Sequence, residues 1–236
     1  FEMTIQRILE KSHNLGTVVV AEKIENEEFY NAWKKLGFGK PLGVMQRSEN
    51  SGELRHFSTW GESDKRSLSF GHGPMTTNLA QLARAYLVFA NEGSIPSLKI
   101  IQTENDANTL APVFSPDSTK RISEILDSVA SIKGSGYRAV IDGYSVAGKT
   151  GTAEMVIDGQ YNKDGAKRTY FVGYSPAENP KYIMAVRLDY PKKCFLSWAP
   201  TKRNRCEGSN SASIAFQKAM KRILINDPEI IPQFEG

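Results

Sequence analysis

The chain has 236 residues, of which 40% are aliphatic, aromatic or cysteine; this length predicts one large domain or a domain with an appendage. The apolar content excludes a disordered or fibrous protein. Thirty Lys and Arg against 26 Asp and Glu give a net charge of +4, spread along the chain. Since nucleic-acid-binding domains concentrate their positive charge in one patch, we expect no nucleic-acid partner. No apolar run approaches the roughly 18 residues of a membrane-spanning helix.

Helical spacing of apolar residues marks much of the first half of the chain. The first helix is expected over residues 3–11 and ends before Asn14 and Gly16, so that Ser12-His13-Asn14 falls in a turn. Ser115 is a natural N-cap for a later helix that starts with Pro116. The expected helices span residues 15–24, 27–36, 76–90 and 116–130, with loops and short strands over 37–61.

The second half of the chain changes to strand-like patterns. Segments rich in β-forming residues cover 144–157, 168–175 and 181–190, and turn-forming residues at Asp158-Gly159, Asp164-Gly165 and 177–180 separate them. Such short connections require antiparallel pairing. A last helix over 211–225 has an apolar face that can cover the sheet. The sequence therefore predicts an α+β fold, a helix/antiparallel-sheet/helix sandwich.

The peptide from Gly143 to Thr150 fits two interpretations. It satisfies G-x-x-x-x-G-K-[ST], the phosphate-binding loop of nucleotide hydrolases, but that loop needs a helix starting at the lysine, whereas here Gly151 and a strand-like segment follow. Alternatively, Lys149-Thr150-Gly151-Thr152 belongs to a strand that places both threonine hydroxyls on one face. An ammonium, two hydroxyls and backbone donors suit an anionic substrate and a developing oxyanion. An ordinary Lys/Thr strand is the simpler alternative.

Ser12 and Asn14 are a second candidate pair. On a turn, both side chains can face a cleft, where the hydroxyl relays a proton and the amide holds a substrate amide. Taken alone, the same residues form a capping turn. The three histidines and two cysteines have no metal-ligand spacing, so we expect no metal and no cofactor.

Together these two motifs resemble a known family. Ser12-x-Asn14 and, 135 positions after Asn14, Lys149-Thr150-Gly151-Thr152 occur in the order of the second and third motifs of the penicillin-recognising serine acyltransferases. Residues 36–39 and 68–86 resemble further segments of class B penicillin-binding proteins. The similarity extends over about residues 3–190 and is closest to the septal, cell-division peptidoglycan transpeptidases.

The resemblance implies a D,D-transpeptidase that cross-links peptidoglycan stem peptides through an acyl-enzyme and is acylated by β-lactam antibiotics. In that family the residue matching Ser12 passes a proton to the leaving group, and the one matching Asn14 binds the substrate amide. The residue matching Lys149 supplies positive charge. The residues matching Thr150 and Thr152 hold the carboxylate of the substrate or antibiotic, and the backbone N–H of the one matching Thr152 forms half of the oxyanion hole. Gly151, which lies between them, completes the substrate-binding set.

The resemblance also implies the penicillin-binding transpeptidase (serine β-lactamase-like) type of sandwich. The family's first motif, Ser-x-x-Lys, supplies the nucleophile, and no serine in this sequence has a lysine three positions later. We therefore expect residues 1–236 to be the C-terminal portion of an N-terminally incomplete transpeptidase domain that is inactive alone. The implied location is the periplasmic face of the inner membrane, held by an N-terminal anchor outside this chain, with division-machinery proteins as partners of other parts.

The tail after Tyr190 departs from the family, which usually has a glycine-rich segment there. This chain instead carries Cys194 and Cys206 with several basic residues between them, and the implied periplasmic location would allow them to form a disulfide. Three alternatives stay open: a non-catalytic β-lactam sensor or division scaffold of the same fold, a D,D-carboxypeptidase, and a P-loop-type nucleotide hydrolase.

Overall fold

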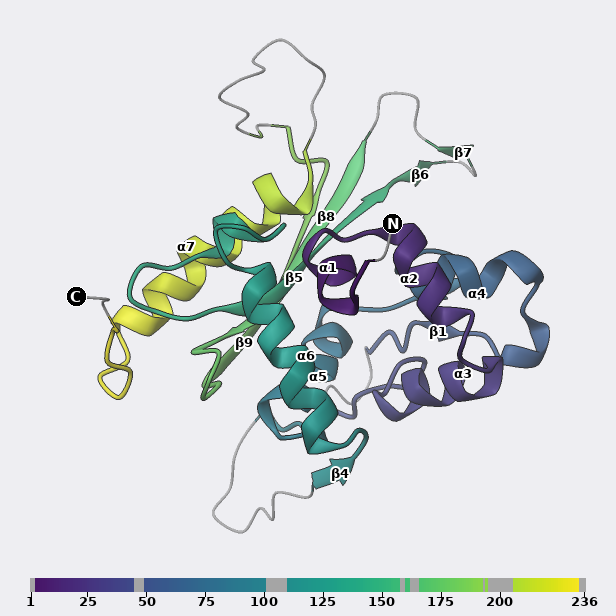
Figure 1. Cartoon of the computed structure of the whole chain (residues 1–236), viewed down its shortest axis with the longest axis horizontal. Helices are drawn as coiled ribbons and strands as arrows, with labels where there is room; N and C mark the ends of the chain where they lie inside the picture. The colour runs from purple at the N-terminus through teal and green to yellow at the C-terminus, as the bar shows by residue number, and fades with distance from the viewer. Residues whose placement is uncertain are drawn as a thin grey trace. The chain divides into compact units, whose positions relative to one another are not determined.

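The computed structural model describes residues 3–44, 49–100, 110–157, 160–161, 166–192, 194 and 206–233. The chain divides into two compact units, Phe1–Ser123 and Glu124–Gly236. Figure 1 labels most of their helices and strands. The turns predicted at Asp158-Gly159 and Asp164-Gly165 lie outside the described residues. Within the described part, no helix is both long enough and apolar enough for a bilayer span.

The first unit is mainly helical, as its apolar spacing predicts. Two antiparallel pairs of very short strands, β1 with β2 and β3 with β4, accompany the helices. The elements are α1 (Ile5–Glu10), α2 (Asn14–Ala21), α3 (Asn26–Lys35), β1 (Glu53–Leu54), η1 (Phe57–Thr59), α4 (Glu62–Ser69), β2 (Met75–Thr76), α5 (Leu79–Ala90), β3 (Ser94–Pro96) and β4 (Leu110–Pro112).

Two predictions for this unit need correction, and one helix is absent from the predictions. Asn14 is the first residue of α2 rather than part of a turn, because the N-cap is His13. The helix expected from residue 76 begins at Leu79, since Met75–Thr76 pairs with β1 and the Asn78 side chain caps the helix by accepting from the backbone N–H of Gln81 (2.8 Å). Helix α4 was not expected at all.

Helix α5 is tied to the preceding loops by a buried polar side chain. Gln81 is 1% exposed, and its amide donates to the carbonyl oxygens of Lys40 (2.9 Å) and Ser51 (2.7 Å). Its own oxygen accepts from the backbone N–H of Asn78 (3.2 Å). Because a buried amide must be hydrogen-bonded, Gln81 ties the backbone at Lys40 and at Ser51 to the helix.

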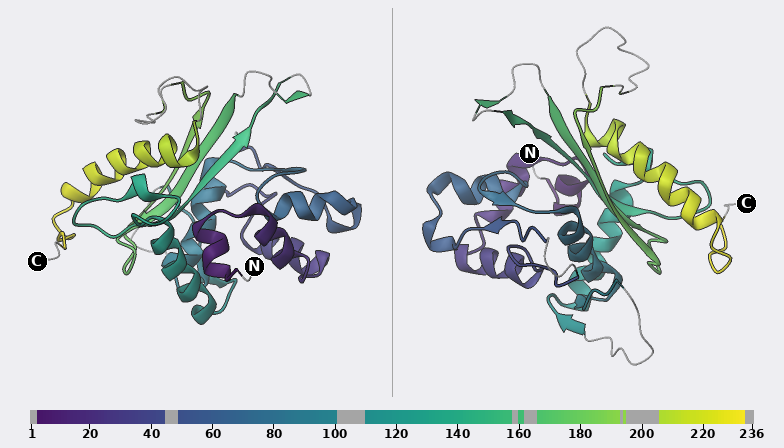
Figure 2. Two further views of the ribbon diagram at one scale, coloured as in Figure 1. Left: turned by 45° about the horizontal axis from the view of Figure 1, so that its top comes forward. Right: turned by 180° about the vertical axis from the view of Figure 1, so that it is seen from behind.

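The second unit is built on a three-stranded antiparallel sheet of order β5-β8-β9. Helix α7 lies along one face of this sheet, as Figures 1 and 2 show. The elements are α6 (Pro116–Val129), which contains the boundary between the units, then η2 (Tyr137–Ala139), β5 (Ala147–Glu154), β6 (Val156–Ile157), β7 (Gln160–Tyr161), β8 (Lys167–Ser175), β9 (Tyr182–Asp189), η3 (Gly208–Asn210) and α7 (Ala212–Ile225). The α+β prediction is confirmed, while the strand expected over 144–157 is shorter and is interrupted at Met155.

Phe171 on β8 is the centre of the core under α7. Its side chain is fully buried, and its ring lies 4.6 Å from that of Phe216 on α7, centroid to centroid. Glycines surround this ring: a Cβ built on Gly148 would lie 2.7 Å from its Cζ, and one on Gly173 would lie 2.9 Å from its Cε1. The glycine before Lys149 therefore leaves room for Phe171 and sets how β5 lies on the core.

A disulfide joins Cys194 and Cys206, whose Cα atoms are 5.3 Å apart. Cys206 is buried, two residues before η3. The bond that the resemblance allowed is thus present, and it connects the segment after β9 with the segment that precedes α7.

Candidate functional site

Ser12 and Asn14 lie at the junction of α1 and α2. Ser12 has a left-handed backbone (φ 53°), which non-glycine residues adopt uncommonly. The next residue, His13, caps α2 through its ring, whose Nδ1 accepts from the backbone N–H of Gly16 (3.0 Å). His13 also donates its backbone N–H to the carbonyl of Ile8 (2.9 Å). A tight turn of three residues therefore joins the two helices, and Ser12 and Asn14 are both exposed.

Close packing of the two helices holds this junction in place. A Cβ built on Gly16 would lie 2.7 Å from Cγ1 of Ile8, and Ile8 is buried. Only a residue without a side chain at position 16 permits that approach. The contact between Gly16 and Ile8 thus helps to set the positions of Ser12 and Asn14.

Lys149 lies within β5, paired in register with Val172 of β8. Its Nζ donates to the carbonyl oxygen of Thr150 (3.2 Å) and approaches the Thr150 hydroxyl (3.4 Å). Burial lowers the pKa of the Lys149 ammonium to about 8, because desolvation disfavours the charged form. At pH 7 the group is still about nine-tenths protonated. It is a poorly solvated cation, which is the kind of group that attracts an anion or a developing negative charge.

The residues after Lys149 alternate as the strand interpretation predicts. Thr150 and Thr152 face Phe171 and Thr169 of β8 in register, so both lie on the same face of the sheet. The Thr152 hydroxyl accepts from the backbone N–H of Gly208 (2.9 Å). Among the described strands, β5 pairs only with β8, so it is an edge strand of its sheet.

The phosphate-loop interpretation does not fit this geometry. Lys149 and Thr150 lie in the middle of an eight-residue strand, and no helix begins at either residue. The mechanism of that loop needs a helix N-terminus at the lysine. The match to G-x-x-x-x-G-K-[ST] arises instead from a turn glycine, Gly143 (φ 81°), and the core glycine Gly148.

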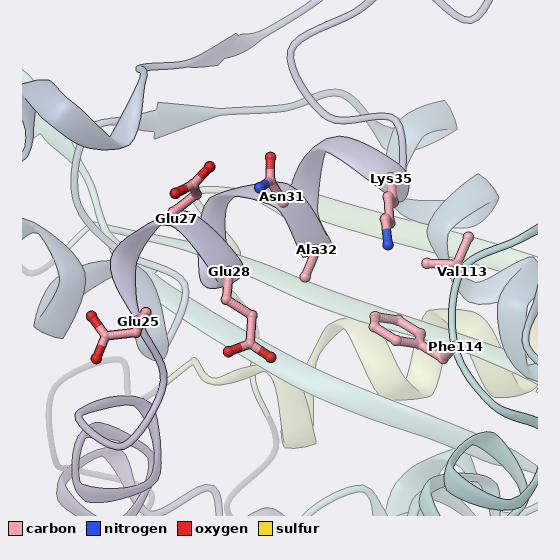
Figure 3. Close-up of a pocket in the computed structure, with 8 residues that line it drawn as sticks. All are labelled: Glu25, Glu27, Glu28, Asn31, Ala32, Lys35, Val113 and Phe114. Atoms are coloured by element: carbon pink, nitrogen blue, oxygen red, sulfur yellow. The ribbon is translucent and has the colours of Figure 1, made fainter.

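The two motifs belong to different units. Ser12 and Asn14 lie together in the first unit, and Lys149, Thr150, Gly151 and Thr152 are consecutive residues of one strand in the second. None of the six lines the cavity of about 540 Å³ in the first unit, where the carboxylates of Glu25 and Glu28 and the ring of Phe114 are found (Figure 3).

A sequence profile described as the penicillin binding protein transpeptidase domain matches residues 1–220. The chain belongs to this family. The match includes Ser12-x-Asn14 and Lys149-Thr150-Gly151-Thr152, the two motifs on which the resemblance to penicillin-binding transpeptidases was based.

Curated relatives support the same assignment. The probable peptidoglycan D,D-transpeptidase PenA of Neisseria flavescens is 31% identical over 193 residues, which are 80% of this chain and 46% of the relative. The peptidoglycan D,D-transpeptidase FtsI of Buchnera aphidicola subsp. Baizongia pistaciae is 33% identical over 229 residues, 94% of this chain and 37% of the relative. The chain therefore spans between about a third and a half of the length of these relatives.

Solved structures agree in fold. The apo transpeptidase domain of Burkholderia pseudomallei penicillin-binding protein 3 superposes with a TM-score of 0.84 at 28% identity, covering 98% of this chain and 67% of that one. Penicillin-binding protein 3 of Mycobacterium tuberculosis, solved with aztreonam, gives 0.78 at 25% identity and covers 98% of this chain and 54% of that one. The penicillin-binding transpeptidase fold is thus shown for this chain.

Sequence reasoning missed one neighbour of the candidate strand. Gly208 is 56 positions from Thr152 and contacts it directly. A signal was present: the short run from Glu207 to Ser211 is rich in glycine, serine and asparagine, and stands immediately before the last helix. Such residues form turns and caps, but the sequence does not say which strand the turn touches.

Proposed function

We propose that the protein carrying this chain is a peptidoglycan D,D-transpeptidase that works through a serine acyl-enzyme and is acylated by β-lactam antibiotics. The observation that carries the proposal is the family match over residues 1–220, which includes both motifs. The relatives named as D,D-transpeptidases support the reaction class. The substrate class is the stem peptide of peptidoglycan, and no cofactor takes part.

The roles proposed for the site residues are those of the matching family positions, and their chemistry suits these roles. Ser12 relays a proton to the leaving group through its exposed hydroxyl, and Asn14 binds the substrate amide. Lys149 contributes a poorly solvated positive charge. Thr150 and Thr152 bind the carboxylate of the substrate, and the backbone N–H of Thr152 also binds the oxyanion. Gly151 between them leaves the approach to the strand open.

The nucleophile belongs to a Ser-x-x-Lys motif outside residues 1–236. In this proposal both compact units are parts of one transpeptidase domain, and the chain alone is inactive. We further propose that the whole protein acts in septal cell-wall synthesis at the periplasmic face of the inner membrane, together with division-machinery proteins. The FtsI relative is named as a D,D-transpeptidase and therefore supports the reaction more directly than the location.

The first test is intact-mass spectrometry after incubation with penicillin. It is run on this chain and on a chain extended upstream to the next Ser-x-x-Lys. We expect an adduct only on the longer chain. An adduct on the short chain would place the nucleophile within residues 1–236, and no adduct on either would favour the non-catalytic sensor or scaffold.

Variants then test the assigned roles in the longer chain. Lys149→Ala should slow acylation by about a hundredfold or more, the usual effect of removing one electrostatic stabiliser of the transition state. Lys218→Ala is the matched control, since Lys218 is an exposed lysine on α7, and it should react like the parent. Equal rates for both variants would remove Lys149 from the mechanism. Analysis of the products formed with an acceptor amine separates transpeptidation from the hydrolysis expected of a carboxypeptidase.

A further inference from the structure

Gly208 connects the segment before α7 to the candidate strand. Its backbone N–H donates to the hydroxyl of Thr152 (2.9 Å), and its carbonyl accepts from the hydroxyl of Ser213 (2.8 Å). Gly208 is buried, so both of its backbone polar groups are satisfied by the protein. Hydrogen bonds therefore fix both the N–H and the carbonyl group of Gly208, and the partner of the N–H, Thr152, is a residue of the candidate site.

Position 208 has no room for a side chain. A Cβ built there would lie 2.6 Å from the carbonyl oxygen of Gly151, 2.7 Å from that of Tyr170 and 3.0 Å from the Gly151 nitrogen. The Cα of Gly208 therefore lies directly against the backbone of β5 and β8, next to Gly151, the residue between Thr150 and Thr152. A glycine is required here by close approach of two backbones, not by its dihedral angles.

Several bonds fix the segment that carries Gly208. The side chain of Asn210 accepts from the backbone N–H of Glu207 (2.7 Å), and the N–H of Asn210 donates to the Glu207 carbonyl (3.1 Å). Ser211 shares a hydrogen bond with the buried hydroxyl of Thr169 on β8 (2.9 Å). The disulfide to Cys194 holds Cys206, two residues before Gly208. These bonds attach the turn to the segment after β9 and to the sheet, and they connect its own residues to one another.

This arrangement determines what the Thr152 hydroxyl can do. A hydroxyl has one hydrogen and two lone pairs. Because the Gly208 N–H occupies a lone pair, the Thr152 oxygen is held in place while its hydrogen remains available to donate. A donor that is oriented before binding suits a carboxylate, which can only accept.

We propose that Gly208 is a positioning residue that orients the Thr152 hydroxyl toward the carboxylate of a β-lactam or stem peptide, and that the Cys194–Cys206 disulfide helps to hold it there. The proposal rests on the transpeptidase function proposed above. Gly208 itself touches no substrate; its effect passes through Thr152.

A double-mutant cycle tests the proposal in the chain extended to Ser-x-x-Lys. The measured quantity is the second-order rate constant for acylation by penicillin, which carries a carboxylate. Thr152→Val and Gly208→Ala should each lower it about tenfold, the scale of one oriented hydrogen bond. The double variant should be no slower than Thr152→Val alone, because without the hydroxyl nothing is left to orient. Thr152→Ser should restore the rate to within about threefold of the parent.

The matched control is Gly61→Ala, because a Cβ at Gly61 meets nothing nearer than 3.8 Å. Gly61 is also distant in sequence from Thr152 and Gly208 and belongs to neither motif. This variant should react like the parent. Losses that multiply in the double variant, or an unchanged rate in Gly208→Ala, would overturn the proposal. If Gly208→Ala does not fold, the variant with both cysteines replaced by serine takes its place in the cycle. An unchanged acylation rate in that variant, or losses that multiply when it is combined with Thr152→Val, would then overturn the proposal. A parent that is never acylated would instead reject the proposed function, and this inference with it.

Discussion

The buried ammonium of Lys149 makes a prediction about stability that is independent of catalysis. Its pKa falls from 10.5 to about 8 on folding because burial disfavours the charged form. Each pKa unit corresponds to about 1.4 kcal/mol, so keeping the charge in the folded state costs about 3 kcal/mol. Replacing Lys149 with Met, which has a similar length and no charge, should remove this cost. We therefore expect Lys149→Met to raise the free energy of unfolding at pH 7.

The sign of the pH dependence follows from proton binding. Between pH 8 and 10.5 the unfolded chain holds the lysine proton and the folded chain has lost it, so the stability of the parent rises with pH in this window. The advantage of Lys149→Met should be about 3 kcal/mol at pH 7, about 2 kcal/mol at pH 9 and below about 0.5 kcal/mol at pH 10.5. Other groups that titrate there are common to both proteins and cancel in the difference.

Urea unfolding followed by circular dichroism at these three pH values measures the difference. Lys218→Met makes the same substitution at an exposed position on α7 and should change stability by less than about 0.5 kcal/mol at every pH. If Lys149→Met lowers the free energy of unfolding at pH 7, or if the gain in unfolding free energy does not shrink as the pH rises, then burial of the charge does not destabilise the folded chain.

Three further predictions concern packing and cross-linking. Phe171→Ala should cost about 3–5 kcal/mol of unfolding free energy, since the fully buried ring loses its contact with Phe216; an unchanged urea midpoint would show that this core does not hold the sheet to α7. Gly16→Val should separate α1 from α2, because even a Cβ would lie 2.7 Å from Ile8, and faster hydrogen exchange of α1 amides should report it. Replacing both cysteines with serine opens a loop of 12 residues and should lower stability by roughly 3 kcal/mol; a melting temperature equal to that of the parent would contradict this.

The regular elements were predictable where a period of apolar residues coincides with a buried face. Helix α7 has Phe216, Met220 and Leu224 at intervals of four, all fully buried, and an apolar period of this kind predicts a helix with one covered face. Helix α4 had no such signal, since Leu68 is its only buried residue. What stabilises its first turn is local, with Asp64 accepting from the backbone N–H of Gly61 (2.9 Å). A mostly polar helix of eight residues is not distinguishable from a loop by its period.

The candidate site was predictable only in its local parts. Alternation along one strand sufficed to place Thr150 and Thr152 on the same face, and a short motif sufficed to select Ser12 and Asn14. The contact between Gly208 and Thr152 depends on how α7 and its preceding turn lie on the sheet, which is a long-range property. The depressed pKa of Lys149 likewise depends on burial, and burial is decided by packing rather than by the four residues of the motif.

The desolvation cost of the Lys149 ammonium also bears on whether Lys149-Thr150-Gly151-Thr152 is a functional motif. A left-handed residue such as Ser12 is weak support for a functional role, because Glu92 at the end of α5 has the same backbone conformation (φ 48°) for an ordinary structural reason. A buried cation is different, since a Met or Leu at position 149 would satisfy the strand without the desolvation cost. An anion that binds there would recover part of the cost by pairing with the ammonium, so saturation with a carboxylate-bearing β-lactam should raise the pKa of Lys149 toward its usual value.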